Sequence, residues 1–387
     1  MQHEPRGIQR IGVLALLWCI GVYMRAPILL AAPLGSRIRD ELGFGQTGLG
    51  ALTTTPVLML GLGALPAALL IGRFGARATL CAALVLAALA SMLRGLAPDL
   101  GLLLGLTAVM GLAIAAMQPA LPALVGRWCP GFAALASTVY LNGMMLGEFI
   151  GAGLTLPLLL PALGDDWRLT LLVFSLPCLL LAPLVWRPTL HGAHQDRAGV
   201  RRLPDWRDRR VWMYGVAMGT TGATFFGLNA YMGPLLQSKG LGGWLDTTLF
   251  VFNATQIAGS FFMMVAARAV LRTRRLLFFT VGTQVIGLGM ALLVDSPALL
   301  PIVITLSLAS ALQLISLVTL PALISTPEQA GKLAAGMFAV GYVLAFIIPL
   351  AAGMASDLLG TVDAALWVFL ACNLLCLPLA WRTSTAV

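Results

Sequence analysis

Long apolar runs recur along the whole of this sequence. Each run holds about 20 residues, and an α-helix of that length crosses the roughly 30 Å of hydrocarbon in a bilayer. Only 10% of the 387 residues are charged, whereas a soluble domain carries about 25%. We therefore predict an all-α integral membrane protein with twelve transmembrane helices. They are expected near residues 10–32, 47–71, 78–97, 100–124, 133–158, 167–186, 211–236, 246–267, 276–294, 298–324, 333–355 and 364–381.

The basic residues lie between the apolar runs and mostly on one side of the membrane. With the N-terminus inside, 18 of the 24 lysines and arginines fall in inner segments and 5 in outer segments, while Arg25 lies within a span. Basic residues near helix ends are retained in the cytoplasm. We therefore predict cytoplasmic termini. The outer five are Arg37, Arg39, Arg94, Arg168 and Lys239.

Several function classes lack their signatures. The net charge of +9 is not gathered into a basic helix or an aromatic-interleaved patch, so no nucleic-acid partner is expected. The six cysteines have no CxxC spacing and the three histidines lie outside the runs, which leaves no metal site. The sequence contains no P-loop, HExxH or GxSxG motif. We expect no catalytic residues and no cofactor.

The two halves of the chain repeat each other. Residues 121–124 and 320–323 both read LPAL at the end of a span, and residues 135–136 with Gly143 match residues 333–334 with Gly341 at nearly the same offset. The repeat predicts two six-helix halves at 1–186 and 211–387. The basic segment 187–210 is predicted to be a cytoplasmic linker near anionic lipid headgroups.

The loop at residues 72–77 reads GRFGAR. It is similar to the D-R-x-G-R-R core of the loop signature of the major facilitator superfamily, with Gly72 in place of the acidic residue. The resemblance implies a conformational switch at Arg73, Gly75 and Arg77. Residues 166–168, DWR, resemble the W-R pair common at the start of span six. The family fold has two pseudo-symmetric halves, with the substrate near mid-membrane between them.

Within that superfamily the sequence most resembles the bacterial cyanate transporters and 2-nitroimidazole exporters. The resemblance covers most of the chain and implies a monomeric secondary transporter in a bacterial cytoplasmic membrane, working by alternating access. The matching stretches are Met24-Arg25, residues 31–34, Ile38-Arg39, 46–49, 52–54, Pro56 and 330–341.

Arg25 and Glu148 are the charged residues that the spans are least able to tolerate. A guanidinium at a helix centre costs roughly 2.5–3.5 kcal/mol on insertion scales, so it usually faces a cavity or a partner. Both residues lie at similar depths in spans one and five. Arg25 is predicted to bind a small anion, or else to form a structural ion pair. Glu148 is predicted to couple transport to protons, or else to be the permanently ionised partner of Arg25.

Uncharged polar residues inside the spans supply the other candidates. Amides and hydroxyls are costly in hydrocarbon unless they face a cavity or bond between helices. The favoured substrate-binding residues are Asn142, Asn229, Tyr231 and Gln313, with helix-to-helix bonding as the alternative for each.

These features predict a transporter of a small anionic or polar organic solute, cyanate-like, with proton coupling through Glu148 left open against its role as the ion-pair partner of Arg25. The alternative within the class is an exporter of small drug-like heterocycles of the 2-nitroimidazole type. The alternative of another class is a channel or a non-transporting membrane sensor. The expected partners are a small-molecule substrate, protons and membrane lipids.

Overall fold

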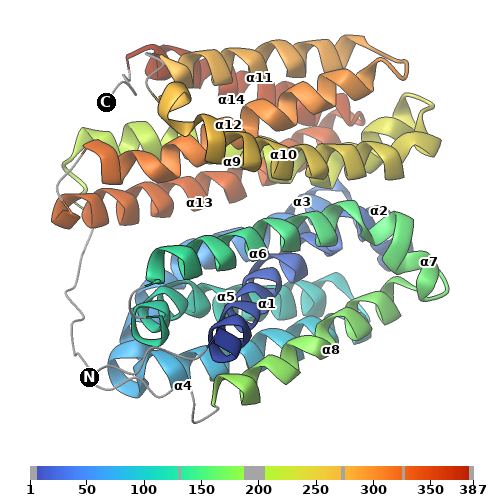
Figure 1. Cartoon of the computed structure of the whole chain (residues 1–387). Helices are drawn as coiled ribbons and strands as arrows, with labels where there is room; N and C mark the ends of the chain where they lie inside the picture. Colours follow the sequence, from blue (N-terminus) through green and yellow to red (C-terminus); the bar gives the residue numbers. More distant parts are fainter. Residues whose placement is uncertain (1–6, 130–131, 187–204, 272–274, 325–326, 383–387) are drawn as a thin grey trace, which may run out of the picture. The chain divides into compact units, whose positions relative to one another are not determined.

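The structure is a computed structural model that describes the chain apart from residues 1–6, 130–131, 187–204, 272–274, 325–326 and 383–387 (Figure 1). All regular structure in the described part is helical, with no strand, and the predicted all-α fold is confirmed. The two termini and most of the predicted linker lie outside the described residues.

The helices form two compact units. Unit 1 comprises Met1–Ala31 with Leu62–Val200, and unit 2 comprises Ala32–Gly61 with Arg201–Val387. The elements of unit 1 are α1 (Gly7–Leu29), α4 (Ala64–Leu93), η1 (Arg94–Leu96), α5 (Leu100–Trp128), α6 (Ala133–Gly153), η2 (Thr155–Leu159), α7 (Leu160–Ala162) and α8 (Trp167–Val185). Those of unit 2 are α2 (Ala31–Leu42), α3 (Gln46–Leu62), α9 (Arg209–Ser238), η4 (Gly242–Trp244), α10 (Leu245–Leu271), α11 (Leu276–Leu293), α12 (Leu299–Ile324), α13 (Pro327–Leu359) and α14 (Asp363–Arg382).

The apolar runs are helices at the expected places. Among the described residues, eight helices are long and apolar enough to cross a membrane, or nine if the pair Val139–Gly153 and Thr155–Ala162, bent by 62°, forms one span. The other predicted spans are occupied by α3 with the start of α4, by α9 and by α10. The protein is therefore a multi-pass membrane protein, and the count of twelve spans is consistent with these helices.

Prolines mark the places where the chain passes between the units. A proline ring clashes with the carbonyl of the residue four positions earlier and removes a hydrogen bond. Pro33 acts in this way on Leu29, the last residue of α1, and Pro66 acts on Leu62, the last residue of α3. The two unit boundaries, at residues 31–32 and 61–62, coincide with these breaks.

The packing units differ from the halves expected from the repeat. The segment 32–61 belongs to the first six spans by chain order, yet it lies in unit 2. The boundaries at 1–186, 187–210 and 211–387 therefore remain a prediction about the sequence repeat.

Small residues set the closest helix contacts in unit 1. Each of Gly143, Gly147 and Gly151 in α6 faces a backbone oxygen of α1, and an added Cβ would lie only 2.3 to 2.6 Å from the oxygens of Trp18, Val22 and Ala26 respectively. Such contacts are typical of helices whose small residues let the backbones approach each other. They fix the register of α1 against α6.

The equivalent pair in unit 2 is α9 with α13. Gly215 and Gly219 of α9 face Val340 and Leu344 of α13, where an added Cβ would lie 2.7 and 2.5 Å from the neighbouring side chain. Spans one and five of the first half thus have counterparts in spans seven and eleven, as the repeat leads one to expect. Both units use glycine to join these two helices.

Candidate functional site

The structure brings Arg25 and Glu148 together across the α1/α6 contact. Arg25 Nε lies 3.5 Å from Glu148 Oε1, and the two side chains are 14% and 20% exposed. The register set by Gly147 and Gly151 places Glu148 beside Arg25, because these glycines seat on the α1 carbonyls that flank it. The pair is largely shielded, yet both side chains keep some accessible surface.

A second polar pair lies on the same stripe of α1. Trp18 Nε1 donates a 3.1 Å hydrogen bond to Asn142 Oδ1. Trp18 and Arg25 are seven residues apart and therefore share one helix face. Asn142 is exposed, and its bond to Trp18 places it beside the stripe of α1 that also carries Arg25.

Arg94 is a third polar feature of unit 1, and its burial was not predicted from the sequence, which assigned it to an outer segment. The 3-10 turn η1 continues α4 and buries Arg94 completely. Its Nη2 donates to Pro27 O at 2.9 Å and to Ser91 Oγ at 3.1 Å, whereas Nε and Nη1 have no hydrogen-bond partner among the described residues. Pro27 lies in the last turn of α1, so the guanidinium complements the negative end of that helix.

Two signals in the sequence could have identified the burial of Arg94. The residue lies inside the apolar run 78–97, and Pro27 and Pro33 lie close together in the first run. An arginine inside a span needs polar groups nearby. Carbonyl groups freed by a helix break can provide them.

The amide candidates of unit 2 are held in hydrogen bonds between helices. Asn229 Oδ1 accepts from Asn253 Nδ2 at 2.8 Å, and Asn229 Nδ2 donates to Phe225 O. Gln313 Oε1 accepts from Gln284 Nε2 at 2.8 Å, and Gln313 Nε2 donates to Ala217 O. All four amide side chains are buried. These contacts favour the alternative that the sequence left open, helix-to-helix bonding.

Tyr231 is also buried, in contact with α3 and α13. Its hydroxyl lies 2.9 Å from Pro349 O and 3.3 Å from Gln46 O. Near it, Asp357 accepts hydrogen bonds from Gln46 N and Thr47 N, both at 2.8 Å, and so caps α3. In this arrangement Tyr231 attaches the segment 32–61 to the rest of unit 2.

The switch-loop residues lie in unit 1 around a break inside α4. Gly75 has φ 82° and ψ 156°, a conformation that favours glycine. Arg77 Nε donates to Val185 O at 2.9 Å and its guanidinium lies over the Trp186 ring. Arg73 lies over the Phe74 ring. Arg77 therefore joins this loop to the end of α8.

Among the described residues, no group of three or more histidine, cysteine, aspartate or glutamate side chains could hold a metal ion. The α1/α6 face instead offers a guanidinium, a carboxylate, an indole and an amide. These groups can bind a small polar or anionic molecule and can exchange a proton at the carboxylate.

Comparison with known proteins places this fold in a family. Residues 14–349 match the Major Facilitator Superfamily. The 2-nitroimidazole transporter of Escherichia coli (strain K12) is 30% identical over 235 residues, which are 60% of this chain and 60% of that protein. The cyanate transport protein CynX of the same strain is 26% identical over 355 residues, 90% of this chain and 91% of the relative.

Solved structures agree on the fold. A bacterial homologue of the human lysosomal transporter Spinster, in an inward-facing and occupied conformation, superposes with a TM-score of 0.76 at 14% identity, covering 97% of this chain and 96% of that one. A D-xylose-proton symporter gives 0.75 at 13% identity, covering 97% of each chain. The chain belongs to the major facilitator superfamily.

Proposed function

We propose that the chain is a secondary transporter that moves a small anionic or polar organic solute across a bacterial cytoplasmic membrane by alternating access, and that it is not an enzyme. The observation that carries the proposal is the Arg25–Glu148 pair on the α1/α6 face, at 3.5 Å. A charged pair inside a bilayer is costly, and such residues commonly mark substrate or proton pathways.

The chemistry of Arg25 supports the substrate class. Its guanidinium is planar and can donate to two oxygens of one group at once. A carboxylate and a nitro group both present two coplanar oxygens, and cyanate carries a full negative charge. The relatives are named as transporters of 2-nitroimidazole, cyanate and, at 21% identity, gentisate. One arginine on an accessible face is suited to each of these molecules.

The same face supports proton coupling. Glu148 is the only acidic residue in the interior of the predicted spans, since Asp246 stands at the first position of its span. When Arg25 binds an anionic solute, the attraction between Arg25 and Glu148 weakens, which favours protonation of the carboxylate. We propose that binding of solute at Arg25 and binding of a proton at Glu148 occur together in the transport cycle.

Flux measurements in proteoliposomes test the proposal. Purified protein is reconstituted, and uptake of radiolabelled cyanate, gentisate and 2-nitroimidazole is followed with and without an inward proton gradient. A carrier is expected to give saturable uptake of at least one compound, and counterflow when unlabelled solute is loaded inside. Saturable flux of 2-nitroimidazole alone would favour the exporter alternative.

Two other outcomes would contradict the proposal. Flux that rises linearly with concentration and shows no counterflow would indicate a channel. Binding in a thermal-shift screen without any flux would indicate a sensor. Empty liposomes and liposomes that contain the Arg25→Ala variant provide the controls for leak.

A further inference from the structure

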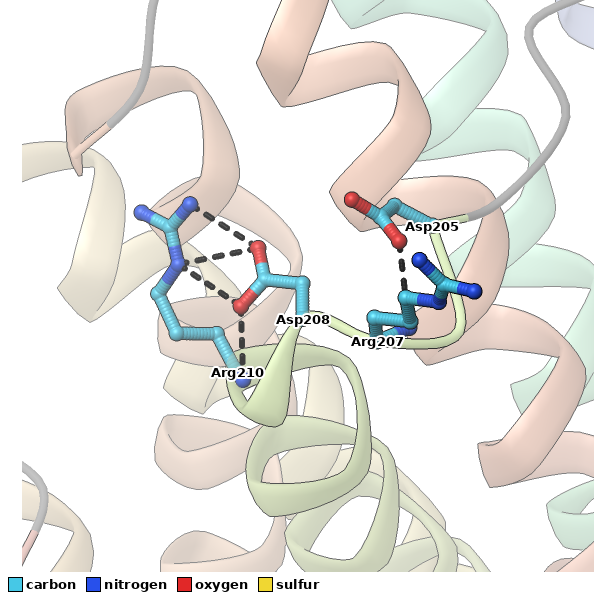
Figure 2. A network of polar contacts seen from close by, with 4 residues as sticks. All are labelled: Asp205, Arg207, Asp208 and Arg210. Atoms are coloured by element: carbon cyan, nitrogen blue, oxygen red, sulfur yellow. Dashed lines mark hydrogen bonds and ion pairs between the residues drawn. The ribbon is translucent and has the colours of Figure 1, made fainter.

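The compact turn at residues 205–212 comprises the described residues before α9 and the first four residues of that helix. It holds two tryptophans and three arginines. Asp205 O accepts from Asp208 N at 3.1 Å, and Asp208 caps α9 by accepting from Arg210 N at 2.9 Å. Asp205 Oδ1 also accepts from Arg207 N at 3.1 Å (Figure 2). These local bonds give the turn a defined shape, so the side chains that it presents are held in a fixed pattern.

The two tryptophans of the turn are exposed, although a tryptophan in a folded chain is highly buried on average. Trp206 and Trp212 are each 50% exposed. Trp212 Nε1 donates to Trp206 O at 3.0 Å, and their rings lie 6.0 Å apart. Tryptophan is enriched where a membrane helix meets the headgroup layer, because its ring is apolar and its N–H is polar. Trp212 lies at the start of the predicted span 211–236.

The arginines of the turn are not equivalent. Arg210 is paired with Asp208, with Nη2 and Nε at 2.9 and 3.1 Å from Asp208 Oδ2 (Figure 2). Arg207 and Arg209 are exposed, and their guanidinium groups have no ion pair with any residue that the structure describes. The turn therefore presents two exposed positive charges that have no ion pair within the described part of the chain, beside two exposed indoles.

We propose that this turn binds an anionic phospholipid of the inner leaflet, with the lipid phosphate at Arg207 and Arg209 and the two indoles among the upper acyl carbons. Charge complementarity selects the anionic headgroup, because each arginine near an anionic surface strengthens binding about fivefold. The indoles select a lipid over free phosphate, since only a lipid supplies an apolar phase beside the phosphate. The site fixes the depth at which α9 begins in the membrane.

Lipid retention by the purified full chain tests the proposal. The protein is equilibrated with equal amounts of phosphatidylglycerol and phosphatidylcholine in detergent, and bound lipid is counted by native mass spectrometry. The wild type is expected to retain phosphatidylglycerol preferentially. In the R207Q/R209Q variant the ratio of bound phosphatidylglycerol to bound phosphatidylcholine is expected to fall at least tenfold. The R207K/R209K variant is expected to keep most of the preference.

R275Q is the matched control. Arg275 is also predicted to lie on the inner side, but its guanidinium is held 3.5 Å from the Trp381 ring centre. Its loss removes the same charge as a single change in the turn, and the preference is expected to change less than twofold. If R275Q and R207Q lower the preference equally, net charge alone accounts for the binding and the site is refuted.

Fluorescence quenching separates a lipid from free phosphate. Lipids brominated on the upper acyl carbons are expected to quench wild-type tryptophan fluorescence more than that of W206F/W212F. This difference in quenching between the wild type and the variant should persist when inorganic phosphate is added. Inorganic phosphate carries no bromine, so it cannot place a quencher beside the indoles. The control W244F removes an exposed tryptophan in η4. Equal quenching of the wild type and W206F/W212F would overturn the proposal, and so would full displacement of phosphatidylglycerol by inorganic phosphate. Neither measurement depends on transport.

Discussion

The pairs α1/α6 and α9/α13 have the same construction and different chemistry. Both are joined through glycines that let two helices approach closely. The pair in unit 1 carries Arg25 and Glu148 at 3.5 Å. At the offset of the repeat, the position of Glu148 corresponds to Phe346 in α13. The scaffold therefore does not require an acidic residue at this point, and its presence in one unit favours a role beyond packing.

The polar side chains away from these pairs show the same division. In unit 1 the buried guanidinium of Arg94 keeps two nitrogens without hydrogen-bond partners among the described residues. Unit 2 has a fully buried network of neutral side chains, with Gln284 bonded to both Thr221 and Gln313, and Asn373 bonded to Thr224. Neutral networks stabilise packing at little electrostatic cost, whereas buried charges cost stability and need another reason to persist.

The largest effect is expected from Arg25→Ala in unit 1. Loss of a hydrogen bond to a charged group costs about 1.5–3 kcal/mol, so transport efficiency, measured as kcat/KM in proteoliposomes, should fall roughly 10- to 100-fold. Arg25→Lys should recover little of it, because an ammonium group cannot make the planar two-point contact. If both variants insert normally into the membrane and take up solute near the wild-type rate, the prediction is wrong and Arg25 has only a structural role.

Glu148→Gln tests whether the carboxylate carries the proton. Solute exchange between the two sides of a vesicle should continue, because exchange need not move a proton, while accumulation driven by a pH gradient should be lost. Phe346→Leu, at the equivalent position of unit 2, is the control and should alter neither. A joint loss of stability and exchange would instead indicate that Glu148 only compensates Arg25, whose isolation costs about 3–5 kcal/mol.

A smaller effect is expected from the amide network of unit 2. Gln313→Leu leaves a buried Gln284 N–H without its acceptor, at a cost of about 1–3 kcal/mol. The double variant Gln284→Leu/Gln313→Leu should cost less than the sum of the two single changes. Thermal unfolding in detergent measures both. The KM for solute should change less than twofold. A tenfold rise in KM for Gln313→Leu would instead indicate that Gln313 contributes to substrate binding.

The smallest effect concerns Asp208 at the start of α9. Hydrogen bonds from the Arg210 side chain lower the pKa of this carboxyl. A lowered folded-state pKa means that the charged group adds stability above its unfolded pKa of about 3.9, and that this stability is lost as the pH falls through the folded value. Asp208→Asn should therefore lower stability at pH 7 by about 0.5 kcal/mol, since the pair is partly exposed. The difference in thermal midpoint from the wild type should shrink below pH 4.

The residue pattern predicted the membrane class, the helical fold and the meeting of Arg25 with Glu148. The length of the apolar runs and the placement of the charges predict the membrane class and the helical fold. Within a bilayer only a few structures, such as helices, satisfy every backbone hydrogen bond. The partners of Asn229 and Gln313 could not be predicted in the same way. An amide in a span satisfies its hydrogen bonds equally well toward a cavity or a neighbouring helix, and only the rotation of each helix decides between them.

The burial of Arg94 and the packing of the segment 32–61 were missed for another reason. Pro27, whose carbonyl accepts from Arg94, and the segment 32–61 both lie beside the end of α1, near Pro33. A proline in an apolar run indicates a bend. It does not indicate which distant helices the next segment will contact.

The placement of α3 has a consequence for the order of synthesis. Gln46 contacts Tyr231, 185 residues later in the chain. At about 5–20 residues per second, the ribosome takes roughly 10–40 s to supply that partner. During this delay α3 is already made while its cap, Asp357, is not. A chain that ends after residue 186 should leave position 47 open to a thiol reagent when a cysteine is placed there, and the full chain should protect it. We therefore expect the first half of this protein to be a nascent intermediate that is completed only by the second.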